Sequence, residues 1–598
     1  MGVVWKNLTV KGAGGGSTFI KTFPDAVLGT LGPDLYNFVT HYIPQLNVFG
    51  KKAPVRTLIN SFTGSLYGGE MMLVLGKPGS GCTTFLKALA NKREGYETVE
   101  GDVTYGGLSP EEVMKKYRGE VVMNTEEDIH FPTLTVAQTL AFAIKQKVPR
   151  VRPNGMRRSE YVQYVLDAIL KMFGIEHTAN TVVGNDVVRG VSGGERKRVS
   201  IAETLVTRAS VMCWDNSTRG LDATTAVDYV KSLRIITDLT GGTSIATLYQ
   251  AGEGIYELFD KVCLIDEGRC IYYGPTNEAV TYFENLGFYK SPRQTSADFL
   301  TGITDKHERT IREGWENRAP RSSVEFEQAY RDSQHQATAI KSADESFNLD
   351  HNVDTFKDSV RQDKKRRMAK SSPYTVSYFE QIYYCFIREI QLSKGQLGAL
   401  LTKFATILFS ALTISATFYE QGNTSTGVFA KGSVLFFSTV FLCWVQLAEV
   451  FNACLGRQII EKHYEFALYR PSAPIIAVFF VDVPIIVAGI SLYSIVVYFL
   501  GSLDIDAGKF WTYYCFITFN AISFNQLFKA VAALSANFGS AIRLVGSLWC
   551  CSGLLTRFFR NAVCLLNIAF SLVGYTIPRY DIGWWYKWVS IFLFHTVT

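Results

Sequence analysis

Residues 71–75, Met-Met-Leu-Val-Leu, lead directly into Gly76-Lys-Pro-Gly-Ser-Gly-Cys-Thr-Thr84, and this stretch decides the fold. The five apolar residues predict a buried strand, the glycines predict a tight turn, and 85–91 predict the start of a helix. Strand, glycine turn and helix form the context that a phosphate-binding loop requires. In such a loop, backbone N–H groups and the helix N-terminus hold the phosphates of a nucleotide.

One position of this loop departs from the usual pattern, G-x-x-x-x-G-K-[ST]. Cys82 stands where the lysine is expected, so the ammonium that neutralises the β- and γ-phosphates is missing. Thr83 keeps the hydroxyl that reaches Mg²⁺. A glycine turn can also be purely structural, and therefore the neighbouring motifs must decide between the two interpretations.

Further apolar strands follow at Val211–Trp214, Ser244–Leu248 and Val262–Ile265, with amphipathic segments between them. Strands that alternate with helices predict an α/β domain with a largely parallel sheet. We place this domain at 51–290, after an N-terminal segment at 1–50.

The charge-rich residues 291–372 follow and predict a polar linker that ends in the basic cluster 364–367. That cluster fits either a solvated linker face or a cytoplasmic cluster beside a membrane. Residues 373–395 are amphipathic and rich in aromatics, which predicts an elbow helix at the membrane interface.

The rest of the chain, 396–598, differs sharply in composition. The whole chain is 47% hydrophobic and 19% charged, and the long apolar runs gather after residue 396. Because about 20 helical residues span the hydrocarbon core, we expect an all-α membrane domain with about five spans. They are 397–419, 432–451, 474–500, 510–535 and 541–577. Five such runs in succession argue against soluble core helices. The basic residues of 452–473 place that loop in the cytosol, and the first domain with it.

The net charge of +6 is modest for 598 residues and gives no reason to expect nucleic-acid binding. Aromatic residues in the expected spans fit either a path for drugs or plain packing against lipid and neighbouring helices. They are Phe436, Phe437, Phe441, Phe519 and Phe524.

A second motif, Val191-Ser-Gly-Gly-Glu-Arg-Lys-Arg198, resembles the signature motif of ATP-binding cassette proteins. A serine and two glycines that open a helix present a hydroxyl and free N–H groups to an anion. In this family the motif touches the γ-phosphate of ATP held by the opposite nucleotide domain. The resemblance therefore implies that Ser192, Gly193, Gly194 and Glu195 serve a partner's ATP.

The same resemblance assigns the remaining positions of the nucleotide site. Phosphates and Mg²⁺ would be held by Gly76, Gly79, Ser80, Gly81, Cys82, Thr83, Thr84 and Asp215, with Thr83 and Asp215 on the metal side. Three further positions depart from the family's pattern: Asn216 replaces the glutamate that polarises water, Tyr249 replaces the switch histidine, and Glu126 replaces a glutamine. No intact catalytic residue is expected, and with Cys82 the changes fall on this chain's own site.

The chain as a whole is similar to the N-terminal half of fungal, full-size, pleiotropic-drug-resistance transporters of the ABCG type. The segments that carry this resemblance are 76–84, 126–132, 213–216, 248–253, 293–300 and 372–377. It implies a P-loop nucleotide-binding domain followed by an ABC-2 type membrane domain, with ATP and Mg²⁺ as cofactors. It also implies a second half, contact with lipid, amphipathic substrates and a place in the plasma membrane.

Two functions remain in view. One is an exporter half whose own ATP site is degenerate, and the other is a regulatory or truncated half without transport of its own. A soluble cassette ATPase is disfavoured by the apolar segments. Within 549–571, Arg557 and Arg560 interrupt the family's pattern, and Val589–Thr598 is too short for a sixth span. We therefore expect an incomplete membrane domain with its C-terminus on the outer side.

Overall fold

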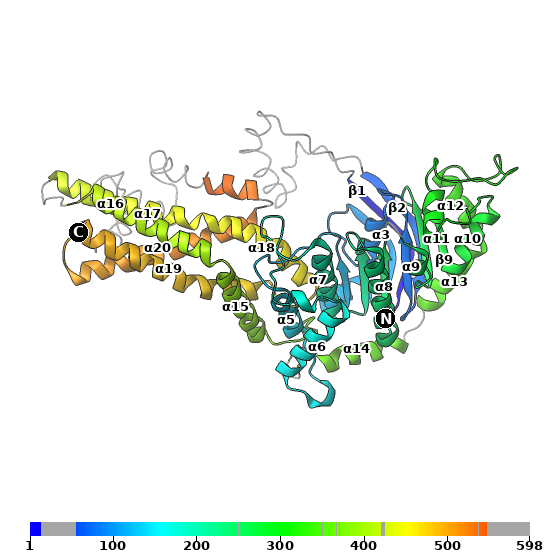
Figure 1. The fold of residues 1–598 in the computed structure, drawn as a ribbon, viewed down its shortest axis with the longest axis horizontal. Helices are drawn as coiled ribbons and strands as arrows, with labels where there is room; N and C mark the ends of the chain where they lie inside the picture. The colour runs from blue at the N-terminus through cyan, green and yellow to red at the C-terminus, as the bar shows by residue number, and fades with distance from the viewer. Residues whose placement is uncertain are drawn as a thin grey trace. The chain divides into compact units, whose positions relative to one another are not determined.

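The computed structural model describes residues 1–13, 55–248, 251–347, 351–365, 368–369, 371–419, 425–501, 503–535 and 538–546. The chain divides into two compact units. Among the described residues, the first comprises 1–13, those from 55 to 384 and 462–473, and the second comprises those from 385 to 461 and from 474 to 546. Figure 1 gives the labels of the elements.

The first unit is built on a sheet whose described strands have the order β4-β1-β2-β9-β8-β3-β7-β6-β5. From β8 to β5 the neighbouring strands are parallel, whereas β4, β1 and β2 pair antiparallel with one another, as do β8 and β9. The predicted α/β domain with a largely parallel sheet is therefore confirmed. The strands are β1 (Val3–Ala13), β2 (Val55–Leu66), β3 (Met71–Leu75), β4 (Thr98–Tyr105), β5 (Val121–Asn124), β6 (Val211–Asp215), β7 (Thr243–Thr247), β8 (Lys261–Asp266) and β9 (Arg269–Pro275).

Helices pack around this sheet, as Figure 1 shows. Several of their starts are set locally by side chains that cap the free N–H groups: Thr135 and Gln138 form a reciprocal capping box at α5, and Asp222 accepts from Thr225 N at α8. The helices of this unit are α3 (Cys82–Leu89), α4 (Pro110–Lys116), α5 (Val136–Lys147), α6 (Arg158–Met172), α7 (Gly193–Val206), α8 (Ala223–Thr240), α9 (Glu253–Tyr256), α10 (Thr276–Asn285), α11 (Ser296–Ile303), α12 (Ser323–Arg331), α13 (Gln334–Phe347) and α14 (His351–Asp363).

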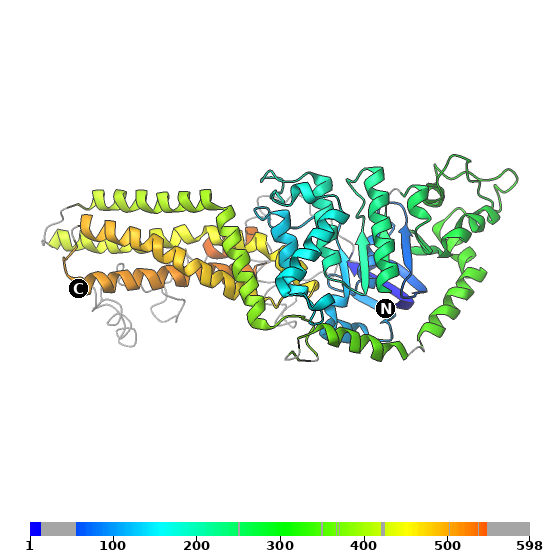
Figure 2. The same ribbon diagram turned by 60° about the horizontal axis from the view of Figure 1, so that its bottom comes forward.

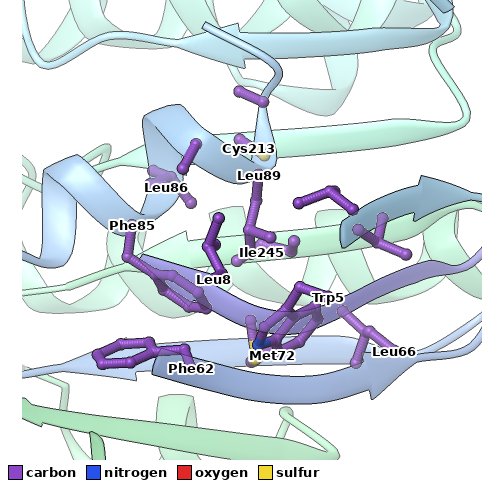
Figure 3. Packing of buried hydrophobic residues seen from close by; sticks show 14 of the residues in the cluster. Trp5, Leu8, Phe62, Leu66, Met72, Phe85, Leu86, Leu89, Cys213 and Ile245 are labelled. Atoms are coloured by element: carbon purple, nitrogen blue, oxygen red, sulfur yellow. The ribbon is translucent and has the colours of Figure 1, made fainter. Parts of the chain in front are cut away.

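The first strand corrects the predicted boundary at residue 51. β1 lies inside the sheet between β2 and β4, and Trp5 packs edge-on against Phe85 of α3 and Tyr273 of β9, with centroids 5.7 and 5.5 Å apart. Figure 3 shows Trp5 and Leu8 within the same buried cluster as the side chains of α3. The apolar residues that alternate along β1 therefore form a core strand of the first unit.

The expected polar linker at 291–372 also differs from the structure. Phe326 and Tyr330 of α12 are buried, Phe326 stacks on Phe288, and Tyr330 Oη donates to the Tyr273 carbonyl at 3.2 Å. Helices α12 and α13 lie beside β9 and β2 (Figure 1). Their high charge concealed these helices in the sequence, because only the few apolar residues on one face of each helix pack against β9 and β2.

In the second unit, Figure 2 shows long helices running alongside one another. Three helices of the described part are long and apolar enough to cross a membrane: Leu397–Thr417, Ala430–Glu465 and Ser472–Leu500. The helices at this end of the chain are α15 (Tyr378–Gly395), α16 (Leu397–Thr417), α17 (Ser425–Gln446), α18 (Ala448–Glu465), α19 (Ser472–Leu500) and α20 (Ala507–Leu534). The expected span at 541–577 and the C-terminus lie almost wholly outside the described residues.

The predicted span 432–451 with a loop at 452–473 differs from the structure, because α18 continues as helix to Glu465. Falling hydropathy marks where a helix leaves an apolar environment and does not mark where the helix ends. α20 covers the predicted span 510–535 but is not among the three apolar helices. Of the aromatic residues considered for a drug path, Phe524 is buried, whereas Phe437 and Phe519 are exposed.

We expect Trp5→Ala to lower the free energy of unfolding of the first unit by about 3–5 kcal/mol, because it leaves a cavity under α3. Urea unfolding of the purified chain, followed by circular dichroism, measures this loss. Tyr164→Ala on α6, whose side chain is 61% exposed, is the control and should stay within about 0.5 kcal/mol. Equal effects of the two substitutions would contradict the placement of β1 in the core.

Candidate nucleotide-binding site

The phosphate-binding loop has the backbone geometry that the sequence predicts. Gly81, which caps α3, has φ 108°, a conformation that L residues with a side chain rarely adopt. Gly76 is crowded, because a Cβ there would lie 2.4 Å from Ser80 Oγ and 2.5 Å from the Ile265 carbonyl oxygen. The Gly268 N–H donates to the Ser80 carbonyl at 2.8 Å and ties the loop to the turn after β8. The loop is therefore held open at the N-terminus of α3, where Thr83 and Thr84 follow in the first turn.

Thr83 and Asp215, predicted on the metal side, are brought together by the sheet. Thr83 Oγ1 donates to Asp215 Oδ1 at 3.0 Å, and Thr247 Oγ1 donates to the same oxygen at 2.9 Å. Asp215 ends β6, which lies beside β7 in the sheet, and β7 in turn lies beside β3, the strand that leads into the loop. Burial raises the pKa of Asp215, while the hydrogen bonds from Thr247 and Thr83 act in the opposite direction.

The lysine position is electrically neutral. Loss of hydration raises the pKa of the Cys82 thiol to about 11, so it carries no charge near neutral pH. Cys82 Sγ lies 3.4 Å from Ser80 Oγ. The nearby Lys77 does not replace the missing ammonium, because its Nζ pairs with Asp266 Oδ1 at 2.9 Å.

Asn216 and Glu126 meet beside Asp215. Asn216 Nδ2 donates to Glu126 Oε1 at 3.3 Å, and Arg219 forms an ion pair with the same carboxylate. Asn216 N donates to Thr247 Oγ1 at 2.9 Å, and its φ is 46°. An amide and a carboxylate already bound to arginine are poor bases for activating water. Tyr249, the third departure, lies outside the described residues.

The signature motif forms the N-terminus of α7. Ser192 Oγ accepts from Glu195 N at 3.3 Å, and Glu195 Oε2 accepts from Ser192 N at 2.8 Å, which makes a capping box. The hydrogen bond from the Ser192 backbone holds the pKa of Glu195 below its usual value, and His177 adds to this. A Cβ at Gly193 would meet no atom within 4 Å, so this end of the helix faces open space.

The loop fits a nucleotide triphosphate with Mg²⁺ at Gly76–Thr84, Thr83 and Asp215. The observation that supports the fit is the start of α3, where no side chain caps the helix, so that backbone N–H groups of its first turn are left for an anion. Bound Mg²⁺ would supply positive charge that Cys82 does not. The glycine backbone is suited to hold phosphate, and the oxygens of Thr83 and Asp215 are suited to hold a metal ion.

A polar cluster at the far end of α7 was not predicted. Glu203, whose side chain is 1% exposed, pairs with Lys462 Nζ at 2.5 Å, His463 Nε2 at 3.0 Å and His130 Nδ1 at 3.4 Å. His463 Nδ1 also lies 2.9 Å from Tyr469 Oη. Lys462 and His463 belong to segment 462–473, which returns from the membrane domain to the first unit. From the sequence, Lys462 and His463 are predicted only as basic residues of a cytosolic loop. No motif in the sequence points to Glu203.

Two lysines, Lys462 of the cluster and Lys197 of α7, also contact the loop that carries Glu126. Lys197, also on α7, donates to the Glu126 carbonyl at 2.6 Å and pairs with Asp128 at 3.1 Å, and Lys462 donates to the Ile129 carbonyl at 3.1 Å. Burial alone would raise the pKa of Glu203, but Lys462 and the hydrogen bond from His463 hold it well below its usual range. Burial and the Lys462 charge lower the pKa of His130 to about 3, so His130 is neutral.

Comparison with known families agrees with this arrangement. Residues 59–219 match the family described as ABC transporter, and residues 380–562 match the family described as ABC-2 type transporter. The chain belongs to the ABC transporters, with a nucleotide-binding domain followed by an ABC-2 type membrane domain, and it is a membrane protein.

Its relatives include fungal multidrug transporters of the ABCG type. The chain is 47% identical over 597 residues to the ABC multidrug transporter atrF of Aspergillus fumigatus, covering 98% of this chain and 37% of that protein. It is 38% identical over 612 residues to the Brefeldin A resistance protein of Schizosaccharomyces pombe, covering 98% of this chain and 38% of the relative. The chain thus spans about two fifths of the length of these relatives.

We expect Glu203→Ala to destabilise the first unit by about 3–5 kcal/mol, because it leaves Lys462 and His463 buried beside no carboxylate. Adding Lys462→Met should recover part of this loss. Denaturant unfolding of the two single variants and of the double variant gives the coupling energy. Glu112→Ala, which breaks an i,i+4 pair with Lys116 at the surface of α4, should change little. Additive effects of Glu203→Ala and Lys462→Met would show that the pair does not interact.

Proposed function

We propose that the chain is one half of an ATP-driven exporter that moves amphipathic small molecules across the plasma membrane, with its nucleotide-binding domain in the cytosol. The pairing of an ABC nucleotide-binding domain with an ABC-2 type membrane domain supports this. So do the printed names of the relatives, which are multidrug transporters and a resistance protein. A second nucleotide-binding and membrane half would complete the transporter, in the same polypeptide or as a partner.

In this proposal the chain's own site holds Mg-ATP but turns it over slowly. Thr83 and Asp215 would face the metal, and the glycine loop would hold the phosphates. The neutral thiol of Cys82 supplies no charge to the phosphates, and Asn216 cannot take a proton from water. Loss of a general base alone costs typically 10²- to 10⁴-fold in rate. Binding without rapid turnover is the behaviour that these side chains favour.

The signature motif would serve the other half. The observation that carries the proposal is the contrast between the two motifs in one domain: the capping box of Ser192 and Glu195 is complete, while the lysine and glutamate positions hold Cys82 and Asn216. Ser192 and Gly193 open a helix toward open space, which suits the phosphate of an ATP bound by another domain. The segment 462–473, paired with Glu203 on the same helix, would relay that event toward the membrane domain.

The purified chain alone should hydrolyse ATP negligibly in a phosphate-release assay with Mg²⁺. Cys82→Lys should tighten ATP binding, because it restores an ammonium, yet leave turnover negligible, because Asn216 remains. Fluorescent-nucleotide titration measures the binding, and heat-denatured chain gives the background. Rapid turnover by the unaltered chain would rule out a degenerate site. If the chain and an added second half together also fail to hydrolyse ATP, the result would instead favour a regulatory half.

In the assembled transporter, Gly193→Asp should reduce turnover by about 10²-fold or more, because it places a carboxylate beside the partner's γ-phosphate. The free space around Gly193 lets the aspartate fit without disturbing α7. The matched change in this chain's own site is Asn216→Gly, which suits the backbone at φ 46° and should leave turnover nearly unchanged. ATPase activity of both variants is compared at equal expression, and equal losses would contradict the division of roles.

A further inference from the structure

The carboxylate of Glu195, at the start of α7, has a separate partner on each of its oxygens. Oε2 accepts from the Ser192 N–H at 2.8 Å, and Oε1 lies 3.0 Å from His177 Nε2. Because an ionised carboxylate can only accept a hydrogen bond, the His177 Nε2–H is the donor. The side chain of His177 is 65% exposed and that of Glu195 is 17% exposed. The pair therefore lies at the surface of the signature motif and not in the core.

A negative charge at this place conflicts with the proposed use of the motif. The N–H groups of Gly193 and Gly194 belong to the first turn of α7, where the helix itself offers them no partner. In the proposed function they bind a phosphate of the partner's ATP. A carboxylate in the same turn can accept from these groups in place of the phosphate, and its charge repels the phosphate. The motif therefore works best when the Glu195 carboxylate is held away from these two N–H groups.

The basic side chains that follow Glu195 on α7 are engaged elsewhere. Arg196 pairs with an aspartate of the loop before the motif, and Lys197 contacts the loop that follows β5. Arg198 donates to a backbone carbonyl of the segment after α6. Among the described residues, the basic side chain that binds the Glu195 carboxylate is therefore His177.

The segment that carries His177 is held in place by two helices. His177 belongs to a short 3-10 helix that follows α6. After it, the Ala179 carbonyl accepts from Ala137 N of α5 at 2.9 Å, and before it, the Phe173 carbonyl accepts from Arg198 Nη1 of α7 at 3.0 Å. The imidazole is thus presented to the start of α7 by a backbone that is fixed on both sides of it.

We propose that His177 is a positioning residue of the signature motif. Its hydrogen bond keeps the Glu195 carboxylate on the Ser192 N–H, so that the N–H groups of Gly193 and Gly194 are left for the γ-phosphate of the partner's ATP. This inference rests on the proposed function, in which the motif completes the partner's site. It adds to the motif a side chain that lies 18 positions before Glu195 in the sequence.

An exposed pair of this kind contributes little to stability, so loss of His177 should affect the reaction with ATP and not folding. In the assembled transporter, His177→Ala should lower kcat/KM for ATP by about three- to tenfold, as expected for one charge near a helix N-terminus. The urea midpoint of the purified chain should not change. His177→Gln, whose amide N–H can replace the Nε2–H, should keep most of the activity. Glu176→Gln, exposed on the same short helix, is the control and should behave as the unaltered chain does.

Glu195→Gln tests whether His177 acts through the carboxylate. Glutamine keeps the capping box, because its side-chain oxygen can still accept from the Ser192 N–H, but it carries no charge. In the Glu195→Gln background, His177→Ala should therefore lower kcat/KM no further. Equal losses in the two backgrounds would overturn the proposal, because His177 would then act independently of the Glu195 charge.

Nucleotide binding gives a second measurement that does not depend on hydrolysis. Equilibrium titration of the assembled transporter with the β,γ-imido analogue of ATP should show about three- to tenfold weaker binding for His177→Ala. ADP, which has no γ-phosphate, should bind unchanged. This chain's own nucleotide loop is the same in both samples, so the difference reports the site that the signature motif completes. Equal losses of affinity for the two nucleotides would contradict a role at the γ-phosphate.

Gly193→Asp in the same assays separates this inference from the proposed function. If Gly193→Asp abolishes turnover while His177→Ala has no effect, the role of His177 is wrong and the proposed function stands. If Gly193→Asp also has no effect, the signature motif does not serve the partner's ATP, and both are wrong.

Discussion

The carboxylate of Glu203 is buried at the C-terminal end of α7, and three basic side chains from two distant parts of the sequence converge on it. Ionised carboxylates are not tolerated in a protein interior without such partners, because the cost of dehydration is large. Lys462 and His463 must therefore stay with Glu203, and segment 462–473 must stay with the nucleotide-binding domain. This one electrostatic constraint explains why 462–473 belongs to the first compact unit although the residues on both sides belong to the second.

The same helix links this constraint to the nucleotide site. The N-terminus of α7 is fixed by the capping box of Ser192 and Glu195, and Lys197 in its second turn holds the loop that contains Glu126. An α-helix of 14 residues is about 21 Å long and stiff. In the proposed function, a displacement at Ser192 would reach Glu203 through the helix itself, without a loop to transmit it.

The backbone shape of the nucleotide loop does not depend on the side chain at position 82. Its shape is set by Gly76 and Gly81, whose positions exclude a Cβ or require a left-handed φ. Those steric requirements do not depend on the side chain at 82. The strand, turn and helix therefore form with Cys82 at this position, and Thr83 meets Asp215 at 3.0 Å. The fold of a phosphate site and its catalytic competence are thus separate properties.

The sequence by itself determined the features that depend on short-range patterns. The buried strands around 73, 213, 246 and 263, the glycine loop, the signature helix and the apolar spans follow from local periodicity and backbone sterics. Only the tertiary structure decided the place of β1 in the sheet, the burial of Phe326, Lys147 and Lys364, and the partners of Glu203. These depend on residues hundreds of positions apart, because burial and charge pairing are properties of a neighbourhood in space. A lysine in a polar stretch of sequence looks the same whether water or another helix surrounds it.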